Sequence, residues 1–215
     1  MIDLHTHTLF SDGELVPSEL VRRAVVKGYR AIAITDHADL SNIDFIVPRI
    51  AKVSEKLSKA WGIRVIPGVE LTHVPPADIA DLAKEARRLG ARLVLCHGET
   101  IVEPVPAGTN SAALNAAIDI LTHPGLITLE DAKLAARKGI YLEITARKGH
   151  SLTNGHVAKT ALAAGAKLLI NTDAHSPGDL ISSEDAEKIG IGAGLSIDDF
   201  RKIVRNAEEL VKKVG

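Results

Sequence analysis

The sequence predicts an α/β fold in which parallel strands close into a barrel surrounded by helices. Short apolar runs typical of strands alternate with helical patterns along the whole chain, and such alternation indicates parallel strands joined by right-handed crossovers. A metal-binding type of side chain also lies at or near the carboxyl end of most strand-like runs. In an open sheet, six such ends would be spread over about five strand spacings of ~4.8 Å. Only a closed ring brings them together, so we expect a barrel with its site at the C-terminal end of the strands.

The order of elements supports this architecture. Helical patterns begin with proline and end at glycine in several places, as helix termini commonly do. No linker, repeat or low-complexity tract interrupts the alternation, so residues 1–215 are expected to form a single domain. The strand-like runs are residues 2–7, 31–37, 64–70, 92–97, 118–123, 140–145 and 168–170; the helical patterns are residues 17–27, 44–60, 76–89, 110–117, 129–137, 154–164, 183–189 and 197–213.

Composition excludes several classes of function. A hydrophobic content of 46% and a charged content of 25% are those of an ordinary globular protein. The formal charge of −1 and the 3% aromatic content make nucleic acid and anionic membranes unexpected partners, since these need basic surfaces and, for single strands, stacking rings. One cysteine, Cys96, cannot form an internal disulfide and suits a reducing compartment. With no signal peptide or membrane-length apolar run apparent, we expect a cytoplasmic location.

The opening stretch contains the first candidate metal ligands. Side chains alternate along a strand, so His5 and His7 are expected on one face, where two imidazoles can bind a single ion. Asp12 follows in the next loop. A lone His-x-His is weak evidence, but a similar arrangement recurs near the other end of the chain, where Asp173 and His175 follow an apolar run.

Together the candidate ligands are too numerous for one ion of four to six ligands. We therefore expect a cluster of two or three ions. Glu70 is the natural bridging ligand, because a carboxylate offers two oxygens whereas an imidazole offers one lone pair. Histidine combined with carboxylate favours zinc, manganese or iron over calcium or magnesium. The nine candidates are His5, His7, Asp12, His37, Glu70, His97, His123, Asp173 and His175.

These residues form an ordered set of motifs that resembles the PHP family, named for its polymerase and histidinol-phosphatase members. The resemblance extends from residue 1 to about residue 180, and the chain is similar to stand-alone histidinol-phosphatase-like members. It implies a distorted (β/α)7 TIM-like barrel, a trinuclear metal site and hydrolysis of phosphate esters. The motifs are His5-Thr-His7, Asp12-Gly13, Thr35-Asp-His37, Pro67-Gly-x-Glu70, His97, His123 and Asp173-Ala-His175.

The resemblance also implies which ligands share an ion. Many family members have histidine at the position of Asp12, and aspartate there is also a competent ligand. The implied sets are His5, His7, Glu70 and Asp173 for the first ion, Glu70, His97 and His123 for the second, and Asp12, His37 and His175 for the third.

The implied activity is a metal-dependent phosphatase that hydrolyses a small phosphomonoester, such as a histidinol-phosphate-like metabolite. A metal-bridged hydroxide would be the nucleophile, with Glu70 holding its position. The chain has no P-loop and no Gly-x-Ser-x-Gly motif that would suggest another chemistry. Two alternatives remain open: a phosphodiesterase or 3′→5′ exonuclease, and a non-catalytic, metal-stabilised accessory module.

Other polar residues are candidates for substrate binding. Arg147, Lys148 and His150 follow the one strand, residues 140–145, that ends without a metal ligand, so their loop should face the open mouth. Arg147 suits a bidentate phosphate contact. His73 lies three residues after Glu70 and is also expected near the mouth.

Two acidic residues are expected close to the ligands. Asp3 should share a strand face with His5, opposite Ile2 and Leu4, and would orient a ligand imidazole from behind. Glu143 should also point inward, but the pattern does not say whether it reaches an ion.

Overall fold

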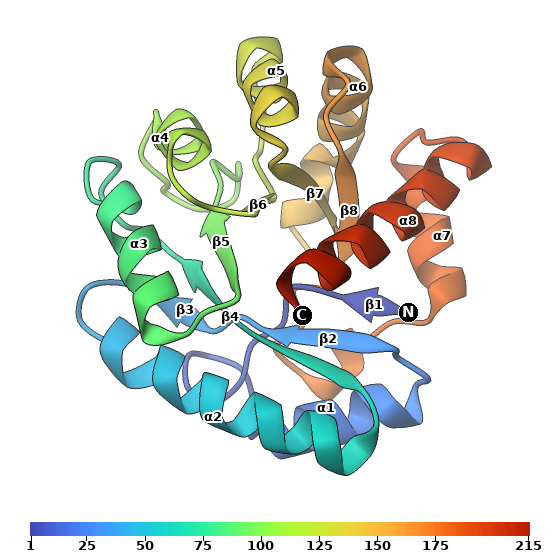
Figure 1. Cartoon of the computed structure of the whole chain (residues 1–215). Coiled ribbons are helices and arrows are strands. Elements are labelled where there is room, and N and C mark those ends of the chain that lie inside the picture. Colours follow the sequence, from blue (N-terminus) through green and yellow to red (C-terminus); the bar gives the residue numbers. More distant parts are fainter.

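The computed structural model describes residues 1–215 and shows parallel strands that form a nearly closed barrel ringed by helices (Figure 1). Sheet neighbours follow the order β1-β2-β4-β5-β6-β7-β8, all pairs are parallel, and β3 also pairs with β4. The predicted α/β barrel is therefore confirmed. The strands are β1 (Ile2–Asp3), β2 (Ala31–Ile34), β3 (His37–Ala38), β4 (Arg64–Leu71), β5 (Leu93–His97), β6 (Ile120–Thr122), β7 (Tyr141–Thr145) and β8 (Leu168–Asn171).

The second predicted strand is split. Ile34 at the end of β2 pairs with Pro67, and His37 at the start of β3 pairs with Glu70, so both pieces lie along β4. Asp36, in the interruption, is buried, and its carboxylate accepts hydrogen bonds from the backbone amide and hydroxyl of Thr8. The break thus ties the β2–β3 segment to the loop that carries the first ligands.

The ring closes at a seam between β1 and β8, with few ladder hydrogen bonds. Thr6 and Ala174 form an isolated parallel bridge. The amide of His7 donates to the carbonyl of Ala174 at 2.8 Å, and the Asn171 side chain accepts from the amide of Leu4 at 2.9 Å. Side chains and loop backbone therefore close the barrel where β1 is too short to do so.

The predicted facing of the first strand is wrong. Ile2 and Leu4 pack in the same buried cluster as Leu93 and Leu169, which lies inside the barrel. The regular strand stops at Asp3. Beyond this point the backbone no longer alternates strictly, so the residues that follow can turn into the barrel mouth even though Leu4 points into its interior.

Helices cover the outside of the ring, and two large buried clusters fill the space between helices and strands. Most predicted helices are present within one to three residues; the third begins at Ile79 rather than near Pro76 because a turn from Pro75 to Asp78 precedes it. No helix is both long and apolar enough to span a membrane. The helices are α1 (Pro17–Val26), α2 (Ile43–Trp61), α3 (Ile79–Leu89), α4 (Thr109–Asn115), α5 (Leu129–Lys138), α6 (Asn154–Ala164), α7 (Ser183–Gly192) and α8 (Ile197–Val214).

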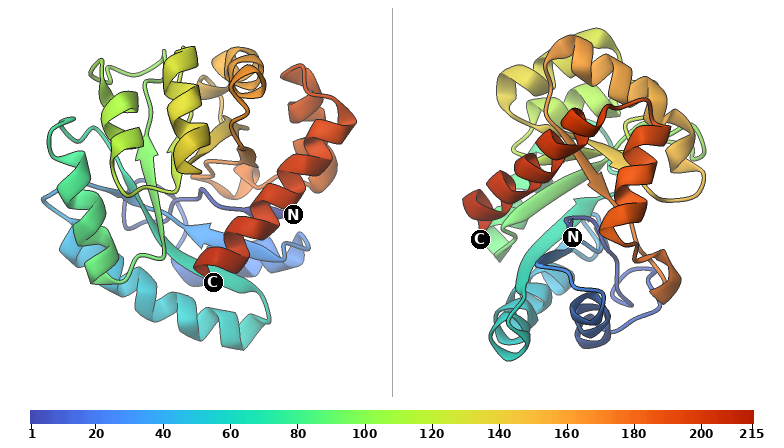
Figure 2. Two further views of the ribbon diagram at one scale, coloured as in Figure 1. Left: turned by 45° about the horizontal axis from the view of Figure 1, so that its top comes forward. Right: turned by 90° about the vertical axis from the view of Figure 1, so that its right-hand side faces the viewer.

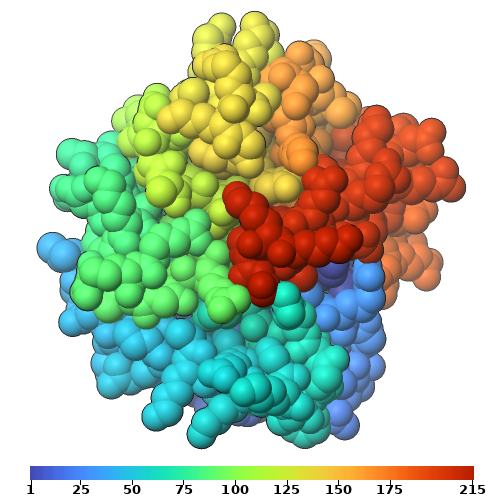
Figure 3. All heavy atoms as spheres, in the orientation of Figure 1, coloured from blue at the N-terminus to red at the C-terminus, as the bar shows by residue number.

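Helix α8 closes the end of the barrel opposite the carboxyl ends of the strands. Its residues Leu210 and Val214 are buried in the interior cluster with Leu93 and Ile2. In Figure 1 and in the left view of Figure 2 the helix runs from the rim to the centre of the ring, and in Figure 3 its red atoms cover the middle of this face. Access to the barrel interior is therefore left to the other end.

Candidate metal centre

A polar cavity of about 260 Å³ lies at the carboxyl ends of the strands. No apolar side chain lines it. Such a lining suits ions and strongly polar ligands rather than an apolar molecule. Its walls are formed by Asp12, His37, Thr72, His73, His97, Glu103, His123, Arg147, His150, Asp173 and His175.

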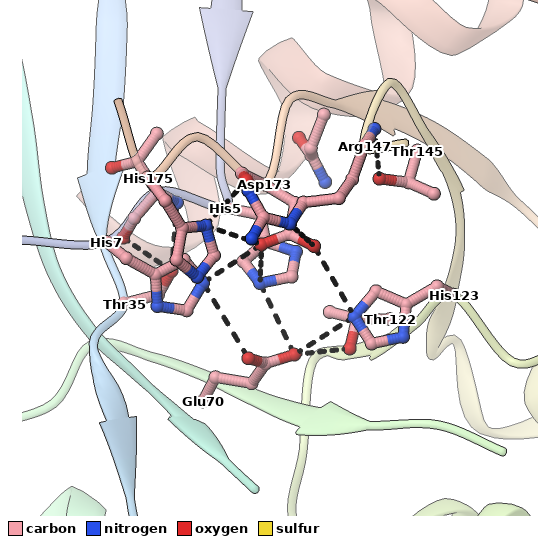
Figure 4. Close-up of polar contacts among 12 residues, drawn as sticks. His5, His7, Thr35, Glu70, Thr122, His123, Thr145, Arg147, Asp173 and His175 are labelled. Carbon is pink, nitrogen blue, oxygen red and sulfur yellow. Dashed lines mark hydrogen bonds and ion pairs between the residues drawn. The ribbon is translucent and has the colours of Figure 1, made fainter. Parts of the chain in front are cut away.

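Glu70 and Asp173 form the centre of the ligand cluster, and His5 and His7 lie against both (Figure 4). The Nε2 atom of His5 is 3.3 Å from Glu70 Oε1 and 3.6 Å from Asp173 Oδ1. That of His7 is 3.7 Å from Glu70 Oε2 and 3.2 Å from Asp173 Oδ1. All four side chains are buried. The structure thus brings together the four residues that the resemblance groups around a first ion.

A second group lies nearer the solvent. The ligand atoms of His7, Asp12, His37 and His175 all lie within 4.8 Å of one another. Asp12 Oδ1 is 3.1 Å from His175 Nε2 and 3.5 Å from His37 Nε2, while the Asp12 side chain remains 57% exposed. The three residues expected around an outer ion therefore converge, and His7 stands between them and the centre.

The third group differs from the expected set. His123 Nε2 is 3.6 Å from Glu70 Oε1, as expected. His97 instead makes its carboxylate contact with Glu103, at 3.1 Å, and the ligand atoms of His97, His123 and His150 lie within 4.8 Å of one another. Glu70 also contacts His37 at 2.9 Å, so this one carboxylate reaches side chains from three parts of the barrel: the segment after β1, the start of β3 and the residue after β6.

Several ligand atoms in the centre have no hydrogen-bond partner, which is the fit expected for cations. Buried polar atoms are ordinarily paired, because leaving them unpaired costs free energy. A divalent ion would bind the one lone pair that each neutral imidazole offers, together with carboxylate oxygens, and would offset the negative charges around them. The unpaired atoms include His5 Nε2, both ring nitrogens of His7, His123 Nδ1 and Asp173 Oδ1.

The pKa shifts in the cluster reflect the same crowding of charge. Burial and the neighbouring His37 lower the pKa of His7 to about 3, so its ring is neutral, as metal ligation requires. Burial opposes protonation of His5 as well, but the carboxylates of Glu143, Glu70 and Asp173 outweigh it and raise the pKa of His5 well above its ordinary value. At His5 the surrounding carboxylates therefore favour a positive charge.

Glu143 rather than Asp3 holds the His5 imidazole from behind. Glu143 Oε2 is 2.8 Å from His5 Nδ1 and accepts a second bond from Asn171 Nδ2 at 2.9 Å. Asp3 instead accepts from the backbone amide of His5 and from the amide and hydroxyl of Thr172. Asp3 thus fixes the backbone of the seam, whereas Glu143 sets the orientation of a ligand ring.

Backbone strain is concentrated in the site. His73, His123 and Asp173 have φ values of 52°, 24° and 53°, and no other non-glycine residue has a positive φ. Residues other than glycine rarely adopt a positive φ, because this backbone conformation costs free energy. Such strain is usually found where function requires a side chain to point in a particular direction. The three residues follow β4, β6 and β8, where each turn directs a side chain toward the mouth.

The candidate substrate-binding residues divide into two groups. Arg147, His73 and His150 line the cavity. Lys148 does not; it is exposed and borders an adjacent hollow. The Arg147 guanidinium is 3.9 Å from Asp173 Oδ2 and 3.8 Å from Asp179, so it has no close partner and remains available to an anion.

Sequence reasoning missed Glu103. Its carboxylate lies 3.1 Å from both His73 Nε2 and His97 Nε2 and 3.2 Å from His150 Nε2. The residue lies in the long loop between β5 and α4, six residues past His97, where neither periodicity nor a strand end marks it.

Comparison with known proteins agrees with this geometry. The family model described as the PHP domain matches residues 3–102. An uncharacterised protein of Methanocaldococcus jannaschii is 51% identical over 215 residues, with 99% of each chain covered. The chain belongs to the PHP domain family.

Two more distant comparisons extend over the whole PHP chain. A protein of Thermoanaerobacter sp. named as a probable phosphatase is 27% identical over 239 residues, covering 100% of this chain and 97% of its own. The crystal structure of histidinol phosphate phosphatase from Lactococcus lactis, solved with zinc, L-histidinol and phosphate, superposes with a TM-score of 0.60 at 17% identity, covering 100% of this chain and 93% of the other. At this identity the likeness shows the shared fold.

Proposed function

We propose that this protein is a metal-dependent phosphatase that hydrolyses a small phosphomonoester of the histidinol-phosphate type. The observation that carries the proposal is the convergence of buried imidazoles on Glu70 and Asp173 beneath an entirely polar cavity. Membership of the PHP family, the relative named as a probable phosphatase and the fold shared with a histidinol phosphate phosphatase support it.

Two to three divalent ions, zinc, manganese or iron, would be held by the nine ligand residues. As the family resemblance implies, His5, His7, Glu70 and Asp173 would hold the first ion, His97 and His123 with Glu70 the second, and Asp12, His37 and His175 the third; of the second set, His123 contacts Glu70. When bound, such ions supply Lewis acidity and lower the pKa of a water molecule toward neutrality.

The protein's own residues position the ester. The Arg147 guanidinium can donate two parallel hydrogen bonds to non-bridging phosphate oxygens, because no carboxylate holds it closely. Glu143 fixes the His5 ring, and Glu70 holds rings from both sides of the mouth in one arrangement. Such prior fixing lowers the entropy cost of bringing ester and attacking water into line.

The shape and chemistry of the cavity favour a monoester over the alternatives. About 260 Å³ accommodates a phosphate with a small alcohol. The lining contains no Phe, Tyr or Trp, so it lacks the stacking platform that single-stranded nucleic acid uses. The cavity therefore favours a phosphomonoesterase. The assay must distinguish this activity from that of a phosphodiesterase or exonuclease, and from a non-catalytic module.

The test is an assay of purified protein reconstituted with manganese or zinc. We expect release of phosphate from p-nitrophenyl phosphate and from histidinol phosphate or another small monoester, with much slower cleavage of the bis ester and of labelled single-stranded DNA. Elemental analysis should give more than one metal per chain. Faster cleavage of the diester or DNA would assign a phosphodiesterase or exonuclease, and no turnover of any ester by metal-loaded protein would assign a non-catalytic module.

A further inference from the structure

Glu103 makes the most concentrated set of contacts that the proposed ligand sets do not use. Its Oε2 is 3.1 Å from His73 Nε2 and 3.1 Å from His97 Nε2, and its Oε1 is 3.2 Å from His150 Nε2. The ligand atoms of His73, His97 and Glu103 form a compact group within 4.8 Å. Of these residues, only His97 belongs to the nine family motif positions.

The loop that carries Glu103 is fixed to the barrel on both sides. The amide of Gly98 donates to the carbonyl of Thr122. The Asn110 side chain bridges the amide of Glu99 and the carbonyl of Pro124, while Glu99 Oε1 accepts from the amide of Asn110. Both ends of the loop that carries Glu103 are therefore anchored to the barrel.

The hydrogen bonds of His97 determine which of its ring nitrogens faces Glu103. Its Nδ1 faces the carbonyl of Gly98 at 3.2 Å, and since a carbonyl can only accept, Nδ1 carries the hydrogen. In the neutral ring, Nε2 then presents a lone pair toward the carboxylate of Glu103. Two acceptors facing each other at 3.1 Å repel, unless a cation lies between them or the ring is doubly protonated.

The spacing fits a shared cation. Two ligands bound about 2.1 Å from one ion, at right angles to tetrahedral angles, lie roughly 3.0–3.4 Å apart. Both contacts of Glu103 Oε2 with imidazole nitrogens have this length. His73, whose ring contacts Glu103, has a strained backbone φ of 52°. The fold therefore holds this ring next to Glu103 in spite of the free-energy cost of the backbone conformation.

We propose that Glu103 is a metal ligand: it binds the cation held by His97, from the outer side of the mouth, together with His73. The contact of His150 with the other carboxylate oxygen fixes the direction of the group. The chain thus has a carboxylate ligand supplied by a loop in addition to those at its strand ends. This inference rests on the proposed metal centre, although not on phosphatase activity.

The test is titration of metal-free protein with Mn²⁺ or Zn²⁺ by calorimetry, with elemental analysis after dialysis. Glu103→Gln keeps the shape of the side chain but removes a charged ligand, so one equivalent should bind at least about tenfold more weakly while the others are unchanged. Glu103→Asp should give a smaller loss, and His73→Asn should weaken the same equivalent. Circular dichroism of the metal-free variants checks that each is folded. If Glu103→Gln does not fold, Glu103→Asp is used as the test variant in its place.

Glu99→Gln is the matched control, because it neutralises an acid in the same loop but retains an acceptor for the Asn110 amide. Its isotherm should equal that of the wild type. The proposal is overturned if Glu103→Gln binds metal like the wild type, as a doubly protonated His97 would predict, if it loses every equivalent, or if Glu99→Gln shows the same loss. If the wild type and the variants bind metal as expected but the wild type hydrolyses no ester, the phosphatase proposal is refuted and the metal-ligand proposal for Glu103 is retained.

Discussion

Glu70 is the residue on which the metal centre depends most. It is completely buried and contacts His5, His7, His37 and His123. Asp12 is largely exposed and contacts only His37 and His175. Loss of Glu70 should therefore disturb two ion positions, whereas loss of Asp12 should disturb one.

We predict that Glu70→Gln lowers kcat by more than the roughly 10–100-fold typical of losing a partner outside the ligand shell, and that Asp12→Ala lowers it less at saturating metal. Metal content should fall by more in Glu70→Gln than in Asp12→Ala. Kinetics and elemental analysis of both variants check this. Equal losses at saturating metal would show that Glu70 does not bridge.

Arg147 should act on the substrate rather than on the metals. If its guanidinium pairs with phosphate equally in the ground and transition states, Arg147→Ala should raise KM and spare kcat. A charge-assisted hydrogen bond contributes about 1.5–3 kcal/mol, so KM for a monoester should rise about tenfold or more. Lys148→Ala, in the same loop but outside the cavity, is the control. An unchanged monoester KM in Arg147→Ala would make Arg147 a solvated loop residue.

At this scale the sequence was informative where a residue lies at a strand end. His97, His123 and Asp173 could be placed because parallel strands deliver their ends to one rim. Glu103 could not, because a loop residue reaches the mouth only through contacts distant in sequence. The role predicted for Asp3 belongs to Glu143 for a similar reason, since one break in period-two alternation decides which carboxylate lies behind His5.

Among the elements, α8 has a well-defined N-terminus. Ser196 and Asp199 form a reciprocal capping box. The Ser196 hydroxyl donates to Asp199 Oδ2 and accepts from the Asp199 amide. These bonds help to fix the start of the helix that closes the barrel with Leu210.

The box should make stability depend on pH. The hydrogen bond from Ser196, followed by that from Lys202, lowers the pKa of Asp199 from 3.8 to about 2. A carboxyl group with a depressed folded-state pKa contributes stability above about pH 4, and this contribution is lost as the pH falls toward 2. Asp199→Asn should therefore cost about 0.3–1 kcal/mol at pH 6 and less at pH 3. Urea unfolding of metal-free protein at both values measures this; an equal cost at both would contradict it.

Helices were easier to predict than strands. The starts and ends of α5 and α6 carry local signals, such as the Thr128 cap and the left-handed Gly139 and Gly165. The split between β2 and β3 has no such signal. It depends on Asp36 accepting hydrogen bonds from Thr8, a contact between distant segments that no local pattern records.

For the whole molecule, bound metal should be part of folding stability. An ion at 100 times its Kd stabilises the folded state by about 2.7 kcal/mol, and each kcal/mol shifts Tm by roughly 2–4 °C in a chain of this size. Removing the ions with a chelator should therefore lower Tm by about 5–10 °C or more. Calorimetry with and without chelator measures the shift, and Glu70→Gln should show a smaller one. A Tm that does not respond to chelation would mean that the cluster does not bind metal in the folded state.

The seam between β1 and β8 bears on the order in which the chain assembles. His5 and His7 lie on one side of it and Asp173 and His175 on the other, and its hydrogen bonds join residues as far apart as Leu4 and Asn171. Contacts over such separations form late, because chain entropy must be lost before they contribute. The ligand set therefore becomes complete only when the ring closes. An ion bound by ligands on both sides of the seam then stabilises the closed barrel. Only chains whose barrel has closed would then bind metal. Amide hydrogen exchange at Leu4 and His7 should slow when the ions bind.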